Sequence, residues 1–362
     1  MQIQLGLHWA CNDGDRHDIP IDLFRLLQAI VDAGTLRAAA DDCAMSYRHA
    51  WGMLQAWQGH FSQVLVDLKR GRGQKAQLTV FGEKLLWEYQ RISARVEPEL
   101  ASLASELSAE LMALEQSESA HNLRIAASHG LVISSLRDLA QQQNKALQLD
   151  IQFQGSLDSL RQYKAGNYDI AGFHLPEGSL GNAVLPQVKR FLNPEKDVLI
   201  YALRRQQGLM MPVDNPNNIQ GLTDLIRPEI KFINRQRNSG SRITLDEMLR
   251  KENIDSHLIN GYENEEFTHS AVAALIASGA ADCGFGLEAA AAQFNLDFIP
   301  LNWEAYWFVL PKVKLNGSAV KHFIQLLQGD LFSQRAATLK GYETSRSGSV
   351  IMPDLDLSVL LF

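Results

Sequence analysis

Long apolar runs, paired cysteines and a leader segment are all missing from this sequence of 362 residues. No apolar stretch approaches the roughly 18 residues that a membrane-spanning helix needs, and the first residues lack the basic and then apolar pattern of a secretory signal. Cys11, Cys43 and Cys283 lie far apart and form no CxxC pair, which is typical of reduced thiols in a cytosolic protein. We therefore expect a cytoplasmic chain with no membrane partner.

Motifs for catalysis and cofactor binding are also missing. The sequence contains no Walker loop (GxxxxGK followed by Ser or Thr) and no GxSxG nucleophile elbow. Its histidines show neither HxxxH nor the Cys/His spacing of a zinc site. We therefore predict a protein that is not an enzyme and that holds no metal or other cofactor.

Composition indicates a soluble protein of several domains. The 46% hydrophobic and 21% charged residues are ordinary for globular proteins, and this length predicts two or three domains. The formal net charge of −7 is unevenly distributed along the chain. Residues 1–95 carry 11 basic and 10 acidic side chains, whereas the remainder carries 23 basic and 31 acidic side chains. The acidic part should repel nucleic acid, so any contact with DNA depends on a local basic patch.

The segment 34–79 has the pattern of a winged helix-turn-helix. Ala38, Ala39 and Ala40 predict a small-residue helix that a second helix can approach closely. Residues 43–45 fit a tight turn, and Ser46 stands at the N-cap of the next helix. On its own this pattern is shared by many helical hairpins, so the residues that follow it matter.

The next helix carries Tyr47, Arg48 and His49 in its first turn, which is the part of a recognition helix that reaches base edges. Its opposite face is predicted to pack into the domain core through Ala50, Trp51, Leu54 and Trp57. A basic loop with two glycines follows, and we expect it to contact phosphates as a wing through Lys69, Arg70, Arg72 and Lys75. These residues predict binding to double-stranded operator DNA.

This segment resembles the N-terminal domain of ModE-type molybdate-responsive regulators and their winged-helix relatives. The resemblance covers roughly residues 1–115 and is carried by MSYRHAW, the Gly/Arg wing and LTVFGEKLL in that order. It implies that Ser46, Tyr47, Arg48 and His49 face DNA and that the loop 69–75 lies on the DNA backbone.

A leucine stripe follows from Glu97, with spacings of three and four residues: Leu100, Leu103, Leu107, Leu111 and Leu114. Pairing with a second copy would bury it, and a two-fold homodimer suits a palindromic operator. The alternative is that the stripe packs on its own winged domain. The polar residues 117–122 (SESAHN) fit a linker.

Beyond the linker, strands and helices alternate, which is typical of a parallel sheet covered by helices. Strands are expected at 123–128, 149–156, 168–175, 198–203, 230–235, 282–286 and 306–311. A short strand or a hairpin arm is also expected within 2–10, and the apolar end LSVLLF is expected to dock on its own domain or on a partner.

An anion cradle is predicted within 232–249. Ser239, Gly240 and Ser241 form a loop between a strand and a helix, and the helix N-terminus would combine with the guanidinium groups of Arg237 and Arg242. The alternative is an ordinary serine cap with solvated arginines.

Two more polar loops follow strands of the expected sheet. Ser128 and His129 follow the first strand, and Ser156 follows the second. Ligands of open parallel sheets bind at the carboxyl ends of strands near helix N-termini. Serine hydroxyls there can donate to a tetrahedral oxyanion without a counter-charge.

Residues 123–350 resemble the cytoplasmic periplasmic-binding-protein-like domain related to molybdate receptors. The motifs that carry the resemblance include FQGS, AGNYDIAGFHLP, INRQRNSGSR and AVAALIASGAADCGFG. It implies two α/β lobes, a two-strand hinge near 203–209 and 305–310, and a ligand cleft. By position, it implies cleft residues at Ser128, His129, Ser156, His174, Ser239, Ser241, Arg242 and Tyr306. The chain departs from the family at Gly130, where an acidic residue is expected.

Together these observations predict a multidomain chain. A mainly α winged helix-turn-helix (1–95) and a dimerisation and linker helix (96–122) precede a two-lobed α/β type II binding domain (123–362). Lobe 1 is expected at about 123–204 and 310–362, and lobe 2 at about 205–309. The predicted function is a one-component transcriptional regulator controlled by a molybdate- or tungstate-like oxyanion or a related organic anion. The alternatives are an anion- or cofactor-binding protein whose winged helix serves assembly, and an enzyme that uses the cleft.

Overall fold

The computed structural model of this chain describes residues 3–12, 14–68, 75–114, 122–128, 130–144, 147–237 and 239–352. The chain forms two compact units, Gly6–Val96 and a larger one that contains Glu97–Phe362. The expectations for Lys69, Arg70, Arg72, His129, the linker residues 117–121 and the apolar end 357–362 concern residues outside the described ranges.

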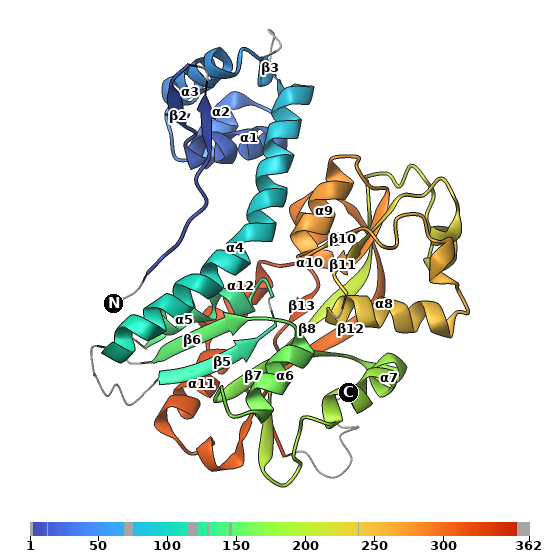
Figure 1. The fold of residues 1–362 in the computed structure, drawn as a ribbon. Coiled ribbons are helices and arrows are strands. Elements are labelled where there is room, and N and C mark those ends of the chain that lie inside the picture. Colours follow the sequence, from blue (N-terminus) through green and yellow to red (C-terminus); the bar gives the residue numbers. More distant parts are fainter. Residues whose placement is uncertain are drawn as a thin grey trace. The chain divides into compact units, whose positions relative to one another are not determined.

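The unit Gly6–Val96 is a helix-turn-helix followed by a β-hairpin (Figure 1). Its elements are β1 (Ala10–Asn12), β2 (Arg16–Asp18), α1 (Ile21–Ala33), α2 (Leu36–Asp42), α3 (Tyr47–Phe61), β3 (Val66–Leu68), β4 (Ala76–Leu78) and the first part of α4 (Val80–Leu114). β3 and β4 pair antiparallel, and Thr35 forms a bridge with Lys75 beside them. This is the arrangement of a winged helix-turn-helix.

The core of this unit follows from apolar residues at helical spacing. In α1 the buried side chains include Leu23, Leu27 and Ile30, one face of a helix. In α2 both Ala39 and Ala40 have no exposed surface, which allows the neighbouring helices to approach closely.

The turn between α2 and α3 is well defined by its hydrogen bonds. Ala44 has a positive φ of 56°. The N–H of Met45 donates to the carbonyl of Ala40, and the N–H of Ala44 donates to that of Asp41, which together form a Schellman motif. Ser46 then caps α3, because its hydroxyl accepts from the N–H of His49 at 3.2 Å.

Two expectations for this unit are wrong. Trp51 is not a core residue, because 40% of it is exposed while Ala50, Leu54 and Trp57 are buried. One helical step of about 100° separates it from Ala50, which turns it onto the side of Tyr47. The short strand or hairpin arm expected within 2–10 begins only at Ala10, where β1 pairs antiparallel with β2.

The larger unit is built on one mixed sheet with the strand order β10-β9-β11-β8-β12-β7-β5-β6. Its strands are β5 (Asn122–Ala127), β6 (Gln148–Phe153), β7 (Ile170–Pro176), β8 (Asp197–Met211), β9 (Phe232–Arg235), β10 (Glu265–Glu266), β11 (Cys283–Leu287), β12 (Asp297–Pro311), β13 (Tyr342–Glu343) and β14 (Val350–Ile351). β5 pairs parallel with β6 and β7, as expected. β8 and β12 run antiparallel to each other, so the whole sheet is not parallel.

Helices cover this sheet on both faces (Figure 1). They are α5 (Leu136–Gln143), α6 (Ser156–Lys164), α7 (Gly178–Lys189), α8 (Gly240–Lys251), α9 (His269–Ala277), α10 (Glu288–Gln293), α11 (Ser318–Gln328) and α12 (Asp330–Ala337), with 3-10 turns η1 (Ile133–Ser135), η2 (Leu222–Ile226), η3 (Ser256–Leu258) and η4 (Lys312–Lys314). Separate apolar cores lie in the two halves of the sheet. The larger unit therefore has two α/β lobes.

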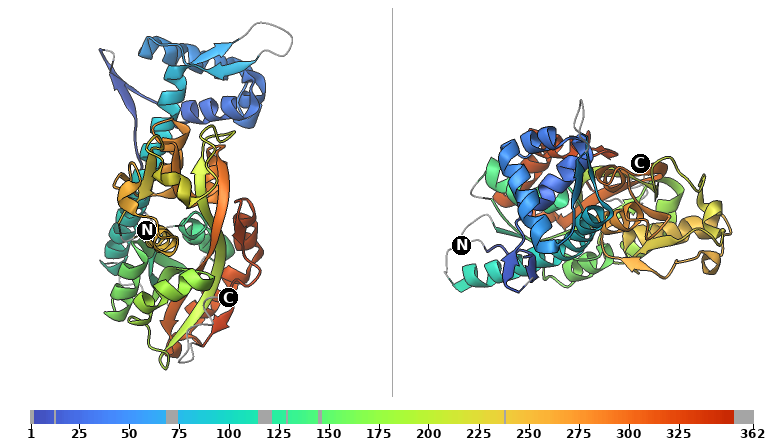
Figure 2. Two further views of the ribbon diagram at one scale, coloured as in Figure 1. Left: turned by 90° about the vertical axis from the view of Figure 1, so that its right-hand side faces the viewer. Right: turned by 90° about the horizontal axis from the view of Figure 1, so that it is seen from above.

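The long strands β8 and β12, each of 15 residues, continue from one lobe into the other (Figure 2). Leu203 lies opposite Tyr306, and Leu209 lies opposite Ile299. The crossing segment of β12 is therefore 299–306 rather than 305–310. Lobe 2 also ends earlier than expected, because 305–309 contribute to the lobe 1 cores. The physical reason is that β12 already pairs with β7 from Glu304 onward.

Candidate functional site

The first turn of α3 presents polar side chains to solvent. Arg48 and His49 are exposed, and Tyr47 is 39% exposed. The Ser46 hydroxyl caps the helix. Ser46 therefore fixes the start of α3 and does not present an unengaged hydroxyl to solvent. Lys75 is also exposed, at the start of β4. This surface has the exposure and the side-chain types that a recognition helix requires.

In lobe 1, the residues expected at the strand ends do meet. The hydroxyls of Ser128 and Ser156 are 2.7 Å apart. Ser156 Oγ also accepts from the backbone N–H of His174 at 3.2 Å and lies 3.4 Å from its Nδ1. The Tyr306 hydroxyl donates to the carbonyl of Ser128 at 3.0 Å. A Cβ on Gly172 would collide with Tyr306, so glycine there makes room for this contact.

Tyr306 itself is a support for the site. It has no exposed surface, and its ring meets His174 edge-on with centroids 4.5 Å apart. Burial raises the pKa of the Tyr306 hydroxyl well above its usual range, so the phenol stays neutral. It can hold Ser128 and His174 in place while the two serines and the imidazole remain for a ligand.

Lobe 2 contributes a second serine–histidine pair. The amide of Gln207 donates to Ser241 Oγ at 3.2 Å, and that oxygen lies 3.3 Å from His269 Nε2. Gln207 is fully buried, and its Oε1 has no hydrogen-bond partner among the residues that the structure describes. Sequence reasoning missed Gln207 and His269. Thr268 before His269 was a readable helix cap, whereas Gln207 has the signature of an ordinary strand residue.

The two pairs converge at Gly240. A Cβ placed on Gly240 would lie 3.8 Å from Ser156 Oγ and 3.8 Å from His174 Cβ, so lobe 2 meets lobe 1 here. We call the group the Ser–His cluster; its members are Ser128, Ser156, His174, Gln207, Gly240, Ser241 and His269. The helices α6, α8 and α9 all begin within it, and helix N-termini favour negative charge.

The two arginines of the predicted cradle are engaged elsewhere. Arg242 donates through Nε to Asp246 at 3.0 Å and lies 3.4 Å from Glu265. Arg237 has 70% of its side chain exposed and pairs with Glu263. Ser239 caps α8 by accepting from the N–H of Arg242. The acidic stretch 263–266 thus competes for both guanidinium groups, which is why the predicted cradle does not form around them.

A buried ion pair lies next to the cluster on the crossing strands. Arg205 and Glu304 are directly opposite in β8 and β12, are 3% and 0% exposed, and are joined by a hydrogen bond of 2.6 Å. Burial alone would lower the pKa of Arg205, but Glu304 and Tyr342 together outweigh it and raise that pKa. A Cβ on Gly130 would lie 3.4 Å from the Arg205 guanidinium. This pair therefore supports the loop that follows Ser128.

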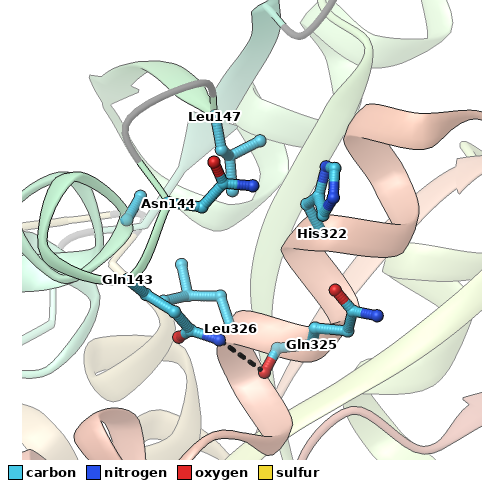
Figure 3. Close-up of a pocket in the computed structure, with 7 residues that line it drawn as sticks. Gln143, Asn144, Leu147, His322, Gln325 and Leu326 are labelled. Atoms are coloured by element: carbon cyan, nitrogen blue, oxygen red, sulfur yellow. Dashed lines mark hydrogen bonds between the residues drawn. The ribbon is translucent and has the colours of Figure 1, made fainter.

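One hollow of about 230 Å³ lies elsewhere in lobe 1, between α5 and α11 (Figure 3). Its lining is Ala140, Gln143, Asn144, Leu147, His322, Gln325 and Leu326. None of these is a lysine, arginine or carboxylate, and none belongs to the Ser–His cluster. The hollow is lined by the polar side chains of one lobe only and has no helix N-terminus among its lining residues, so it is not our candidate site.

Within the described ranges, no group of three or more His, Cys, Asp or Glu side chains is placed to hold a metal ion. The same residues include no helix with the length and apolarity needed to cross a membrane. Cys283 is buried, and burial raises the pKa of its thiol.

Two curated relatives are themselves uncharacterized. The protein YvgK of Bacillus subtilis (strain 168) is 38% identical over 200 residues, which are 55% of this chain and 64% of that protein. The uncharacterized protein in the ferredoxin 2Fe-2S gene 5' region of Clostridium pasteurianum is 37% identical over 110 residues, or 30% of this chain and 97% of the relative. This chain thus spans slightly less than two thirds of YvgK.

Solved structures of similar fold are distant. A cysteine mutant of OxyR from Corynebacterium glutamicum, bound to hydrogen peroxide, has a TM-score of 0.45 at 15% identity and covers 88% of this chain and 94% of its own. CbnR, a LysR family transcriptional regulator, has a TM-score of 0.39 at 14% identity, with 85% and 100% covered. Similarities this weak carry no conclusion about function.

The family comparison reaches further, because it covers residues 137–328, which is more than half of the chain. The matched range includes Ser156, His174, Gln207, Ser241 and His269 and so takes in both serine–histidine pairs. It corresponds to the two-lobed sheet crossed by β8 and β12. This chain belongs to the PBP superfamily.

Proposed function

We propose that this chain is a one-component transcriptional regulator whose DNA binding responds to a small anion held at the Ser–His cluster. The observation that carries the proposal is the meeting of hydroxyls, an amide and helix N-termini from both lobes around Gly240. The exposed first turn of α3 supports the DNA-binding half.

The chemistry of the cluster favours an oxyanion. Ser128, Ser156 and Ser241 supply hydroxyl donors, and the amide groups at the starts of α6 and α8 add partial positive charge. A tetrahedral oxyanion of the molybdate or tungstate class presents oxygens in several directions and suits such a set. A related organic anion of similar size would use the same donors.

The strand connections give the ligand a way to act. An anion bound by both lobes stabilises the arrangement in which the lobes are close, and it shifts the equilibrium only by its difference in affinity for the two arrangements. The helix α4 begins in the unit Gly6–Val96 and continues into the larger unit. We propose that this continuous helix carries the change to α3.

The test is a fluorescence titration of the full-length chain on DNA selected from a random pool, with and without molybdate, tungstate, sulfate and phosphate. We expect salt-dependent, sequence-selective binding whose midpoint shifts with one of these anions. Binding that ignores every anion would refute the switch. Anion binding without affinity for DNA would instead favour a role of the winged helix in assembly.

Arg48→Ala tests the recognition helix. Loss of a base contact costs about 1–3 kcal/mol, so affinity for the selected DNA should fall about 10- to 100-fold and discrimination should relax. The measurement is the same titration against selected and random DNA. Arg25→Ala is the matched control, because Arg25 is an exposed arginine in α1. Equal behaviour of the two variants would contradict the assignment of α3.

The leucine stripe of α4 tests the homodimer that we propose. Leu103 is 48% exposed and Leu107 is 39% exposed in one chain. The double change Leu103→Glu with Leu107→Glu should convert a dimer into monomers, because charge would be buried in the pairing face. Sedimentation velocity measures the oligomeric state of each variant. Val80→Glu, at an 84% exposed position of the same helix, should leave it unchanged. Dimers in both variants would place the interface elsewhere.

A further inference from the structure

We propose that the anion binds together with a proton, and that His174 and His269 are the residues that hold this proton against the anion. This inference rests on the proposed anion site but adds two specificity-determining residues and a pH-dependent affinity. It makes Gln207 and His269 ligand-binding residues, although neither was expected from the sequence.

The first step is the charge around the cluster. On β8 and β12, Arg205 and Glu304 form a neutral pair. On β9 and β10, Arg235 and Glu266 are a second cation and anion, and Arg235 donates to the carbonyl of Glu266 at 3.3 Å. These two pairs therefore add no net charge beside the cluster.

The arginine of α8 does not change this balance, because Arg242 is held by Asp246 and Glu265. Ser156 and Tyr306 contact His174, Ser241 contacts His269, and these three neighbours are uncharged. Bringing a dianion into such a site is costly unless positive charge accompanies it. An imidazole is the side chain that can gain that charge near neutral pH.

The second step is the direction of the serine hydrogens. Ser241 Oγ already accepts from the Gln207 amide and lies 3.3 Å from His269 Nε2. When Nε2 carries no proton, it can accept the single hydroxyl hydrogen of Ser241. When Nε2 is protonated, it donates to Oγ, and that hydrogen is released for the ligand. A hydrogen on Nε2, in the imidazolium or in the neutral Nε2–H tautomer, therefore makes Ser241 an anion donor, and only the imidazolium also supplies positive charge.

Lobe 1 repeats this arrangement. Ser156 Oγ accepts from the backbone N–H of His174 and lies 3.4 Å from Nδ1 of the same residue. A proton on Nδ1 would again direct the hydroxyl hydrogen of Ser156 away from the imidazole. Gly240 lies next to this hydroxyl, since a Cβ placed on it would be 3.8 Å from Ser156 Oγ.

The third step is the amide of Gln207. Its Oε1 is buried without a partner among the described residues, and a buried polar atom left unpaired destabilises the protein. The other atom of the same amide contacts Ser241, so the unpaired atom belongs to the cluster. A ligand that carries a proton can donate it to Gln207 Oε1. A ligand that brings a proton to the site can instead allow the Gln207 amide to rotate, so that Oε1 reaches another donor.

The experiment is calorimetric titration of the full-length chain with sodium molybdate, and separately with tungstate, between pH 6 and 9. Each titration is repeated in two buffers of different ionisation enthalpy. We expect proton uptake of up to one per anion, and a Kd that rises about tenfold per pH unit above the imidazole range for one linked proton. This measurement uses the unaltered chain and does not depend on a variant that folds.

The variants His174→Gln and His269→Gln test whether these histidines take up the proton when the anion binds. Either change should flatten the pH dependence and reduce the proton uptake, whereas His257→Gln, at an exposed position in η3, should retain both. Binding without proton uptake, with a Kd independent of pH, would overturn the inference and leave the proposed effector intact. No binding of either anion at any pH would instead remove the effector, and with it this inference.

Discussion

Glu304→Ala should destabilise the crossing of the two lobes by about 3–5 kcal/mol. The change leaves Arg205 buried, charged and without the carboxylate that lies opposite it in β12. Removing one member of a buried ion pair costs far more than the pair contributes, because the remaining charge stays away from water. The segment of β8 that carries Gln207 and the facing segment of β12 should loosen with it.

Hydrogen exchange measured by mass spectrometry locates this effect. Amides of β8 and β12 should exchange faster by a factor on the order of 10²–10³. Glu343→Ala is the matched control, because Glu343 pairs with Arg204 on the same strand but is 43% exposed, and such pairs contribute at most about 1 kcal/mol. Replacing Arg205 and Glu304 together with apolar residues should restore protection. No difference between the two single variants would contradict the role of burial.

Gly208→Ala should cause the second large loss of stability, of about 3 kcal/mol, through overpacking. The new Cβ would collide with the carbonyl oxygen of Ile299 in the facing strand. That oxygen belongs to paired backbone, next to an irregularity between Pro300 and Asn302, so it cannot move without disturbing β12. The expected result is weakened pairing where the strands enter lobe 2.

The measurement is again hydrogen exchange by mass spectrometry. The amides to follow are those in the parts of β8 and β12 that lie in lobe 2. Gly221→Ala is the matched control in the same lobe, since a Cβ at Gly221 meets nothing within 4 Å. Protection that survives Gly208→Ala would show that the strands can separate locally without cost. Loss of protection in both variants would point to a general effect of removing glycine.

Local features of the fold could be predicted from the sequence. Ser46 was readable as a cap because capping depends on a few neighbouring residues. The strands β5, β6 and β7 were readable because turn residues bound each apolar run. The helix α7 was missed, since its glycines and Pro186 resemble a loop. The full lengths of β8 and β12 were also missed, because polar residues such as Gln206 and Asn302 interrupt their apolar pattern.

The site was predictable only in part, for a different reason. Ser156 and Ser241 lie at helix starts, and such positions can be inferred from one segment at a time. The partners of Arg242 cannot be inferred from one segment, because Glu265 is brought to Arg242 by the pairing of β9 with β10. Gln207 and Ser241 meet across 34 residues. Contacts of this kind depend on strand order, which local patterns leave open.

The discontinuity of lobe 1 has a consequence for synthesis. β14, at Val350–Ile351, pairs with β8, so lobe 1 is complete only when nearly all of the chain has been made. The unit Gly6–Val96 has its own core and is finished some 250 residues earlier. At typical elongation rates of 5–20 residues per second, that interval is roughly 10–50 s. A nascent or truncated chain would therefore have a folded α3 before lobe 1 of the proposed anion site is complete.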